Sequence, residues 1–154
     1  MQLMKTQKIK MNLSEKNLRE KDFHNELHSR PKGRFENIFY KALANAWDDF
    51  YERLKIKTRN AEVLDYGCGV GPSIIKVSNY KPKKITGIDI SEISIKKAKD
   101  RTRDLGSMVE LKVDNCEKTS FENNRFDLVY GHGILHHFEF SKCLDEILRV
   151  LKPG

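Results

Sequence analysis

The sequence holds few cysteines, and their arrangement is typical of neither a disulfide framework nor a metal site. The three cysteines, Cys68, Cys116 and Cys143, are odd in number and far apart, and none belongs to a CxxC motif or a cluster with histidine. Disulfide-stapled domains and zinc sites both need closely spaced sets of ligating or pairing residues. We therefore expect no disulfide framework and no bound metal.

Long apolar runs are missing as well. The N-terminal stretch MQLMKTQKIKMNL has no apolar core of signal-peptide length. Nowhere do the roughly 20 apolar residues of a membrane-spanning helix follow one another. We expect a cytoplasmic protein without a membrane span.

The positive charge is concentrated at the front of the chain and is not arranged as a basic run. The net charge is +7, and residues 1–60 hold 14 basic against 8 acidic residues, whereas residues 61–154 hold 15 against 14. Acidic side chains are interleaved throughout the front region, which favours a solvated surface over a nucleic-acid interface. Nucleic-acid binding remains an alternative that its dependence on salt would reveal.

The first 60 residues are predicted to be a loose tail followed by helices. A helix is predicted from Ser14 to about Arg30, and a second, stronger one covers residues 35–54, where apolar side chains recur every three or four positions. This stripe includes Phe50 and Tyr51. It is more typical of packing against a core than of a cofactor or substrate site.

The remainder alternates short apolar strands with helices. Strands are predicted at AEVLDY, KITGIDI, MVELKVD and FDLVYG. Helices are predicted from Pro72 to about Tyr80, from an N-cap at Ser91 to Gly106, and from about Ser141, the last with Leu144, Ile147, Leu148 and Leu151 on one side. The pattern favours an α/β fold with a doubly wound parallel sheet, preceded by the N-terminal helices.

A glycine-rich turn follows the first strand, in VLDYGCGVG. Gly67, Gly69 and Gly71 have the spacing G-x-G-x-G, whereas a dinucleotide site has G-x-G-x-x-G and a P-loop ends in GK[ST]. Glycines at such a turn let the backbone approach a ligand closely. Asp65, two residues earlier, would repel a pyrophosphate and suits a ligand with positive charge.

Two further acids end the next strands. Asp89 ends the second strand and can accept hydrogen bonds from both hydroxyls of a ribose. Asp114 ends the third and can accept a hydrogen bond from an adenine amino group or from a neighbouring backbone amide. Three acids at adjacent strand ends favour a nucleoside with a cationic group.

Together these motifs resemble the class I, seven-strand methyltransferases that use S-adenosylmethionine, in their small-molecule branch. The resemblance covers residues 61–154 and includes VLDYGCGVG, ITGIDIS, VDNCEKTSFENNRFDLVYGHGILHHF and ILRVLKPG. It implies a Rossmann-like core, here with about four strands in the order 3-2-1-4. It also implies that residues 1–60 form the lid or substrate side of residues 61–154.

The resemblance assigns roles to the matching positions. Asp65 would face the ammonium group of S-adenosylmethionine, and Asp89 would hold its ribose. The remaining cofactor contacts would be Gly67, Cys68 and Gly69 at the amino-acid end, Ile90, Asp114, Asn115 and Cys116 around adenine, and Gly131 near the methyl group.

Histidines follow the fourth strand in GHGILHHF. His132 and His137 are candidates for a general base, with a structural hydrogen bond as the alternative for each. The [DN]PP[YF] pattern of methyltransferases that act on amino groups of bases and glutamine is absent, as is an acid triplet for a catalytic metal. We expect transfer to an O or C atom of a small metabolite.

The family continues beyond KPG into a fifth strand and further elements. We therefore expect a C-terminally incomplete domain whose fourth strand is an exposed edge, which a protein partner or a second copy would cover. Two alternatives remain. One is a non-catalytic partner subunit that binds S-adenosylmethionine, and the other, less favoured, is an NAD-dependent oxidoreductase.

Overall fold

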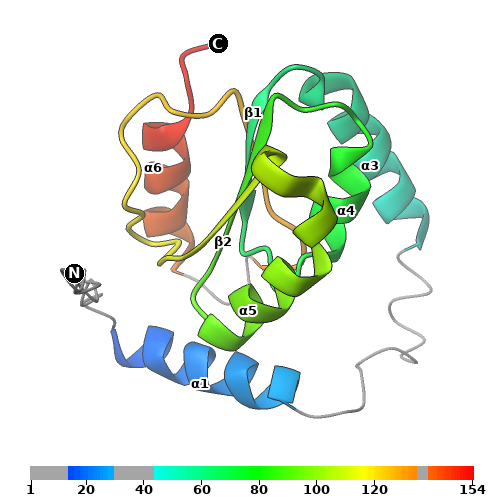
Figure 1. The fold of residues 1–154 in the computed structure, drawn as a ribbon. Coiled ribbons are helices and arrows are strands. Elements are labelled where there is room, and N and C mark those ends of the chain that lie inside the picture. The colour runs from blue at the N-terminus through cyan, green and yellow to red at the C-terminus, as the bar shows by residue number, and fades with distance from the viewer. Residues whose placement is uncertain (1–13, 30–43, 135–138) are drawn as a thin grey trace, which may run out of the picture.

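The computed structural model describes residues 14–29, 44–134 and 139–154 of the chain. Its centre is a parallel four-stranded sheet in the order β3-β2-β1-β4 (Figure 1). The strands are β1 (Glu62–Tyr66), β2 (Lys84–Asp89), β3 (Val109–Val113) and β4 (Leu128–Tyr130). Each strand contains β-branched residues, which suit a pleated and buried sheet. The predicted strands and their predicted order are confirmed.

Helices cover both faces of this sheet. α3 (Ala44–Thr58), α4 (Pro72–Ser78) and α5 (Glu92–Arg101) lie on one face, and α6 (Phe140–Val150) lies on the other (Figure 1). α1 (Glu15–Ser29) lies against α5. Among the described helices, none is both long and apolar enough to span a bilayer. The arrangement confirms the predicted doubly wound α/β fold.

The core consists of two apolar clusters, one on each face of the sheet. Successive residues of a strand point to opposite faces, so Val63 joins the cluster beneath α3, α4 and α5, whereas Leu64 joins the cluster beneath α6. Leu54 of α3 is buried in the first cluster, with Phe50 and Tyr51 packed against it. This end of α3 therefore belongs to the same core as the sheet.

The helix predicted from residue 91 ends earlier than expected. Ser91 is its N-cap, and the Ser91 Oγ accepts a hydrogen bond of 3.1 Å from the Ser94 amide, as predicted. The α-helix stops at Arg101, however, and a 3₁₀ segment, η1 (Arg103–Met108), follows. Gly106 lies inside η1 with φ 54° and ψ −135°, so the prediction that it closes the α-helix is wrong.

The buried face of α6 also differs from the prediction. α6 buries Cys143, Glu146 and Val150, whereas Leu144 and Leu148 of the predicted apolar side are 43% and 63% exposed. The periodicity of apolar residues could not reveal that an acidic side chain is buried here through hydrogen bonds. α6 therefore presents an apolar stripe to its surroundings.

Candidate functional site

The glycine-rich turn lies at the carboxyl end of β1 and folds back onto β2. Gly67, Gly69 and Gly71 have φ values of 80°, 54° and 81°, in the left-handed region that favours glycine. The Gly67 and Cys68 amides donate hydrogen bonds of 3.0 and 2.8 Å to the Ile88 carbonyl oxygen. The spacing G-x-G-x-G thus places a glycine at each position where the turn needs a positive φ.

Asp89 links this turn to the start of α5. Its Oδ2 accepts a hydrogen bond of 2.9 Å from the Gly69 amide, and its Oδ1 accepts one of 2.8 Å from the Ser91 amide. The side chain is half-buried, as is that of the next residue, Ile90. A carboxylate oxygen can accept more than one hydrogen bond, so a hydroxyl donor is chemically compatible with these two backbone contacts.

Asp65 is buried in contact with two hydroxyl groups. Its Oδ2 accepts hydrogen bonds of 2.5 Å from the Ser73 hydroxyl and 2.9 Å from the Tyr130 hydroxyl. Its Oδ1 is buried and has no hydrogen-bond partner among the residues that the structure describes. Burial raises the pKa of Asp65 to about 7, against the two hydrogen bonds, which lower it, and the charge of Asp89 raises it further.

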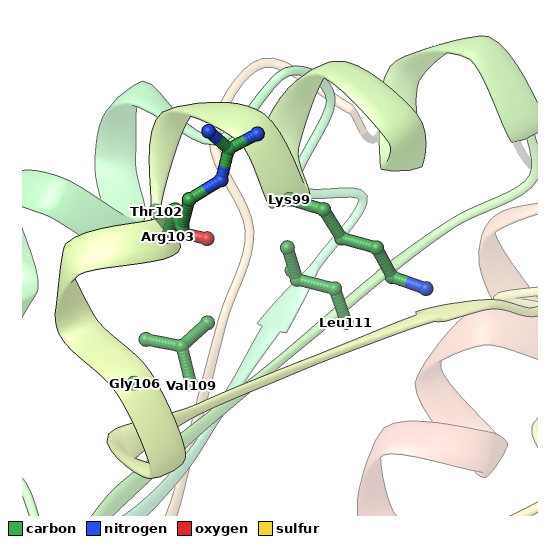
Figure 2. Close-up of a pocket in the computed structure, with 6 residues that line it drawn as sticks. All are labelled: Lys99, Thr102, Arg103, Gly106, Val109 and Leu111. Atoms are coloured by element: carbon green, nitrogen blue, oxygen red, sulfur yellow. The ribbon is translucent and has the colours of Figure 1, made fainter.

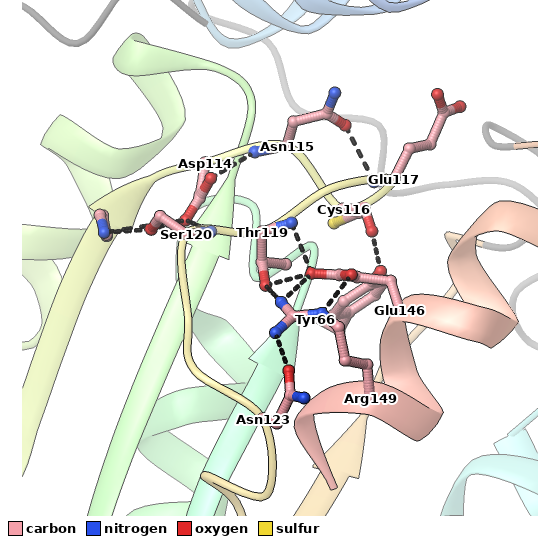
Figure 3. Close-up of polar contacts among 11 residues, drawn as sticks. Tyr66, Asp114, Asn115, Cys116, Glu117, Thr119, Ser120, Asn123, Glu146 and Arg149 are labelled. Carbon is pink, nitrogen blue, oxygen red and sulfur yellow. Dashed lines mark hydrogen bonds and ion pairs between the residues drawn. The ribbon is translucent and has the colours of Figure 1, made fainter.

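The predicted adenine side has its polar groups paired within one loop (Figure 3). The Oδ1 of Asp114 accepts a hydrogen bond of 2.9 Å from the Asn115 amide, and its Oδ2 accepts bonds of 3.1 and 2.6 Å from the amide and hydroxyl of Ser120. The Asn115 Oδ1 accepts a bond of 2.9 Å from the Glu117 amide. Of the two partners predicted for Asp114, the described residues supply the backbone amide.

Helix α6 anchors this loop through a buried acid (Figure 3). The Glu146 Oε1 accepts hydrogen bonds of 2.7 and 2.5 Å from the amide and hydroxyl of Thr119, and it lies 2.6 Å from the Arg149 Nη2. Burial raises the pKa of Glu146, but the bonds from Arg149 and Thr119 outweigh it and hold the pKa below its ordinary value. A second contact comes from β1, where the Tyr66 hydroxyl donates a hydrogen bond to the carbonyl oxygen of buried Cys116 in this loop.

His132 lies after β4 among aromatic side chains of α3. Its ring centre is 4.9 Å from that of Trp47, 5.8 Å from Phe50 and 6.3 Å from Tyr51. Its Nε2 is buried without a hydrogen-bond partner in the described part of the chain. Burial, and secondarily the charge of Lys76, lowers the pKa of His132, so the ring is neutral at neutral pH. The other candidate base, at position 137, lies outside the described residues.

Ile134 fills the space between the glycine turn and the end of β4. A Cβ at Gly67 would lie 2.7 Å from its Cγ2, and a Cβ at Gly131 would lie 2.5 Å from its Cδ1. A pocket of about 180 Å³ adjoins it. The pocket is lined by Tyr66, Val129, Tyr130, Gly131, Ile134 and Ile147. Pockets that bury a drug-sized ligand span roughly 300–1,000 Å³, so a nucleoside fits here only if Ile134 moves.

A second pocket lies at the opposite end of the sheet (Figure 2). It has a volume of about 160 Å³ and is bounded by α5, η1 and the start of β3. Its lining residues are Lys99, Thr102, Arg103, Gly106, Val109 and Leu111. Figure 2 shows the Lys99 and Arg103 side chains pointing in different directions, so their charges do not converge on one ligand position. Within the described residues, no cluster of His, Cys, Asp and Glu is arranged to hold a metal.

The structure brings most of the predicted residues to the carboxyl end of the sheet. The three acids lie at adjacent strand ends, and the Asp114 amide donates a hydrogen bond of 3.1 Å to the Asp89 carbonyl oxygen. Ser73 and Tyr130 were missed by sequence reasoning. Tyr130 reaches Asp65 because the two are register partners at the ends of neighbouring strands, and this register is not visible in the sequence.

Comparisons with known proteins point to one family. A family model described as a methyltransferase domain matches residues 63–154. The 24-methylenesterol C-methyltransferase 3 of Arabidopsis thaliana is 32% identical over 104 residues, which are 66% of this chain and 29% of that protein. Phosphoethanolamine N-methyltransferase 1 of the same plant is 28% identical over 127 residues, which are 79% of this chain and 26% of that protein.

The fold has solved relatives as well. A SAM dependent methyltransferase from Aquifex aeolicus superimposes with a TM-score of 0.62 at 25% identity, covering 69% of this chain and 58% of that chain. The matches thus span under a third of the two plant relatives and somewhat more than half of the solved structure.

Proposed function

The chain belongs to the methyltransferase domain family, in the Rossmann-like class that uses S-adenosylmethionine, and we propose that it transfers the methyl group of this cofactor to a small metabolite. The observation that carries the proposal is the turn at the end of β1. Its three glycines, Gly67, Gly69 and Gly71, all have positive φ, and the Asp89 carboxylate holds it through the Gly69 amide. Such bare backbone beside an acid suits a ligand that combines a ribose with a positive charge.

The residues at the carboxyl end of the sheet fit the cofactor. The buried Oδ1 of Asp65 lacks a partner among the described residues, and an ammonium group or a bridging water would supply one. A Cβ at Gly69 would meet no atom within 4 Å, which leaves the tip of the turn open to a ligand. The side chain that must give way is Ile134.

We propose the following division of contacts. Asp65, with the backbone of Gly67, Cys68 and Gly69, takes the amino-acid end, and Asp89 accepts the ribose hydroxyls. Around adenine the proposed contacts are Ile90, Asp114, Asn115 and Cys116, and near the methyl group Gly131. Because the Asp114 oxygens are occupied by their own loop, its contribution is to shape the adenine side.

When bound, S-adenosylmethionine supplies an electrophilic methyl group on a sulfonium. The chain has to align the acceptor and exclude water. We propose His132 or His137 as the base that takes a proton from the acceptor, and the lowered pKa of His132 leaves its ring neutral for this role. Residues 1–60 would form the substrate side, where α3 already places Trp47 and Phe50 against His132.

The proposed acceptor atom is O or C. The two plant relatives are named for methylating carbon of a sterol and nitrogen of phosphoethanolamine, respectively. Both acceptors are small molecules, which supports a small metabolite for this chain. Because the match spans less than a third of either relative, the acceptor remains a proposal.

We further propose that a protein partner or a second copy covers the outer edge of β4. Among the described strands, β4 pairs only with β1, and Leu151 forms an isolated parallel bridge with Phe126 beside it. α6 next to this edge leaves Phe140 58% and Leu148 63% exposed. An open edge beside apolar side chains favours association, which light scattering of the purified protein would detect.

The cysteines support a cytoplasmic location, which we propose here. Cys68, Cys116 and Cys143 are all free and buried. Unpaired thiols persist in reducing compartments, whereas oxidising compartments favour disulfides.

The proposed function is tested by calorimetric titration with S-adenosylhomocysteine. We expect saturable binding to the wild type and a loss of about 30-fold or more in affinity for Asp89→Ala, which removes the ribose acceptor and the support of the glycine turn. Asp100→Ala is the matched control, because Asp100 is an exposed acid that pairs only with Arg103 in the described structure. Equal heats for wild type and Asp89→Ala would contradict the assignment.

A further inference from the structure

Three buried polar side chains from different elements meet beside the glycine turn. Asp65 of β1, Ser73 of α4 and Tyr130 of β4 are 1%, 7% and 4% exposed. Both hydroxyls donate to the same carboxylate oxygen, Oδ2, at 2.5 and 2.9 Å. The other oxygen, Oδ1, is equally buried and accepts no hydrogen bond from the described residues.

Burying Oδ1 without a hydrogen-bond partner lowers the stability of the fold unless a ligand or a water binds it. A buried acceptor without a partner costs about 1–3 kcal/mol of stability. Asp114, in the nearby loop, avoids this cost because both of its oxygens accept hydrogen bonds. The two hydroxyls favour the charged form of Asp65, since each lowers the pKa that burial raises. They therefore limit the rise in pKa, so that at neutral pH about half of the molecules carry a carboxylate whose Oδ1 has no partner among the described residues.

The position of Tyr130 is fixed by the sheet. Asp65 and Tyr130 are register partners in the ladder between β1 and β4. Ser73 lies in the first turn of α4, which begins where the glycine turn ends. The two donors are thus carried by the same elements that shape the proposed ligand site.

We infer that Tyr130 and Ser73 are positioning residues, which hold the Asp65 carboxylate so that its Oδ1 receives the ammonium group of the bound cofactor or a water that bridges to it. This inference rests on the proposed function. In this role both residues act on the bound cofactor through Asp65.

Few other groups near Asp65 change charge around neutral pH. Asp89 contributes a negative charge from β2. The Cys68 thiol and the Tyr51 hydroxyl of α3 lie nearby, and burial raises the pKa of each, so both stay neutral. His132 titrates in both wild type and variants, so its contribution cancels when their pH profiles are compared.

The test is calorimetry with two ligands over about pH 5.5 to 7.5, where an amino group keeps most of its charge. S-adenosylhomocysteine carries the amino-acid group, and methylthioadenosine carries the same nucleoside without it. We expect Tyr130→Phe and Ser73→Ala each to weaken S-adenosylhomocysteine binding about tenfold and to leave methylthioadenosine binding unchanged. In the wild type the affinity should be half lost near pH 7, and in each variant most of it should already be lost at that pH, because losing either hydrogen bond raises the pKa of Asp65 further.

Tyr51→Phe is the matched control, because it removes a neighbouring hydroxyl that donates no hydrogen bond to Asp65. If Tyr130→Phe fails to fold in a thermal melt, Ser73→Ala carries the test. Equal weakening of both ligands, or an unchanged pH profile, would overturn the inference while leaving the proposed function intact. Absence of S-adenosylhomocysteine binding to the wild type would instead overturn the proposed function and, with it, the inference.

Discussion

Asp65 and Asp114 are both buried acids at the carboxyl end of the sheet, yet their oxygens are used differently. Asp114 pairs both oxygens with its own loop, at Asn115 and Ser120. Asp65 places two hydrogen bonds on one oxygen and leaves the other without a partner among the described residues. A buried acid with both oxygens hydrogen-bonded stabilises the fold. A buried acid with one oxygen unpaired lowers the stability, and a ligand that binds this oxygen can restore it.

The same contrast extends to the segments around the two acids. The loop after β3 is tied down by Glu146 and Tyr66, which lie on the face of the sheet that α6 covers. The turn after β1 is open at Gly69, whereas at Gly67 the Ile134 side chain closes it. We therefore expect the proposed adenine side to be preformed and the proposed amino-acid side to rearrange when the cofactor binds.

The largest expected effect is on stability, where substitution of the two acids by asparagine should have opposite signs. At about pH 8, Asp65→Asn should stabilise the protein by up to about 4 kcal/mol, because the pKa of Asp65, raised to about 7, means that a charged carboxylate is buried at that pH. The folded state favours the protonated acid, so its stabilising contribution is complete below about pH 4 and is lost as the pH rises through about 7. Urea unfolding at several pH values measures the change.

Asp114→Asn is the control for that comparison. It should destabilise the protein by about 1–3 kcal/mol, because the amide nitrogen cannot accept the hydrogen bond that the Ser120 amide donates. If both substitutions were destabilising at about pH 8, the distinction between the two acids would be wrong.

A second expected effect concerns Glu146, which anchors the proposed adenine side. Glu146→Ala should cost about 2–3 kcal/mol in the free energy of unfolding, because it leaves the Thr119 amide unpaired and Arg149 without its buried partner. It should also weaken binding of methylthioadenosine, since the loop loses its support. Denaturant unfolding and calorimetry measure the two changes. Asp145→Ala, at the exposed neighbouring acid, should change neither.

The smallest expected effects distinguish two glycines of the turn. Gly71→Ala should cost about 2 kcal/mol in stability, because φ is 81° and the new Cβ would lie 3.2 Å from that of Ala98. Gly69→Ala should cost about 1 kcal/mol, since its Cβ would meet only open space. We expect the reverse order for S-adenosylhomocysteine affinity, with Gly69→Ala the weaker binder. Thermal melts and titrations of both variants would show whether the less stable variant is also the tighter binder.

The sequence was sufficient for the frame of the site. The spacing of Gly67, Gly69 and Gly71 predicted a tight turn after the first strand, and in the structure all three glycines have positive φ. Apolar runs located the four strands because local periodicity reflects burial on a sheet. The resemblance to a methyltransferase then supplied the strand order, which the structure confirms.

Contacts between distant segments could not be predicted in the same way. The hydrogen bond from Tyr130 to Asp65 depends on the register of β4 against β1, and the burial of Glu146 depends on a loop 27 residues away in the chain. The end of α5 was misjudged because Gly106 looked like a terminal glycine, whereas it adopts an extended ψ within a 3₁₀ segment. Such outcomes are decided by tertiary packing.

A crystal structure of the protein with S-adenosylhomocysteine tests the central claim most directly. We expect the ribose hydroxyls on Asp89, the amino group within hydrogen-bonding reach of Asp65 directly or through one water, and Ile134 displaced from Gly67. A ligand bound instead in the pocket between Lys99 and Leu111, or bound with Asp65 and Asp89 both out of reach, would contradict the account.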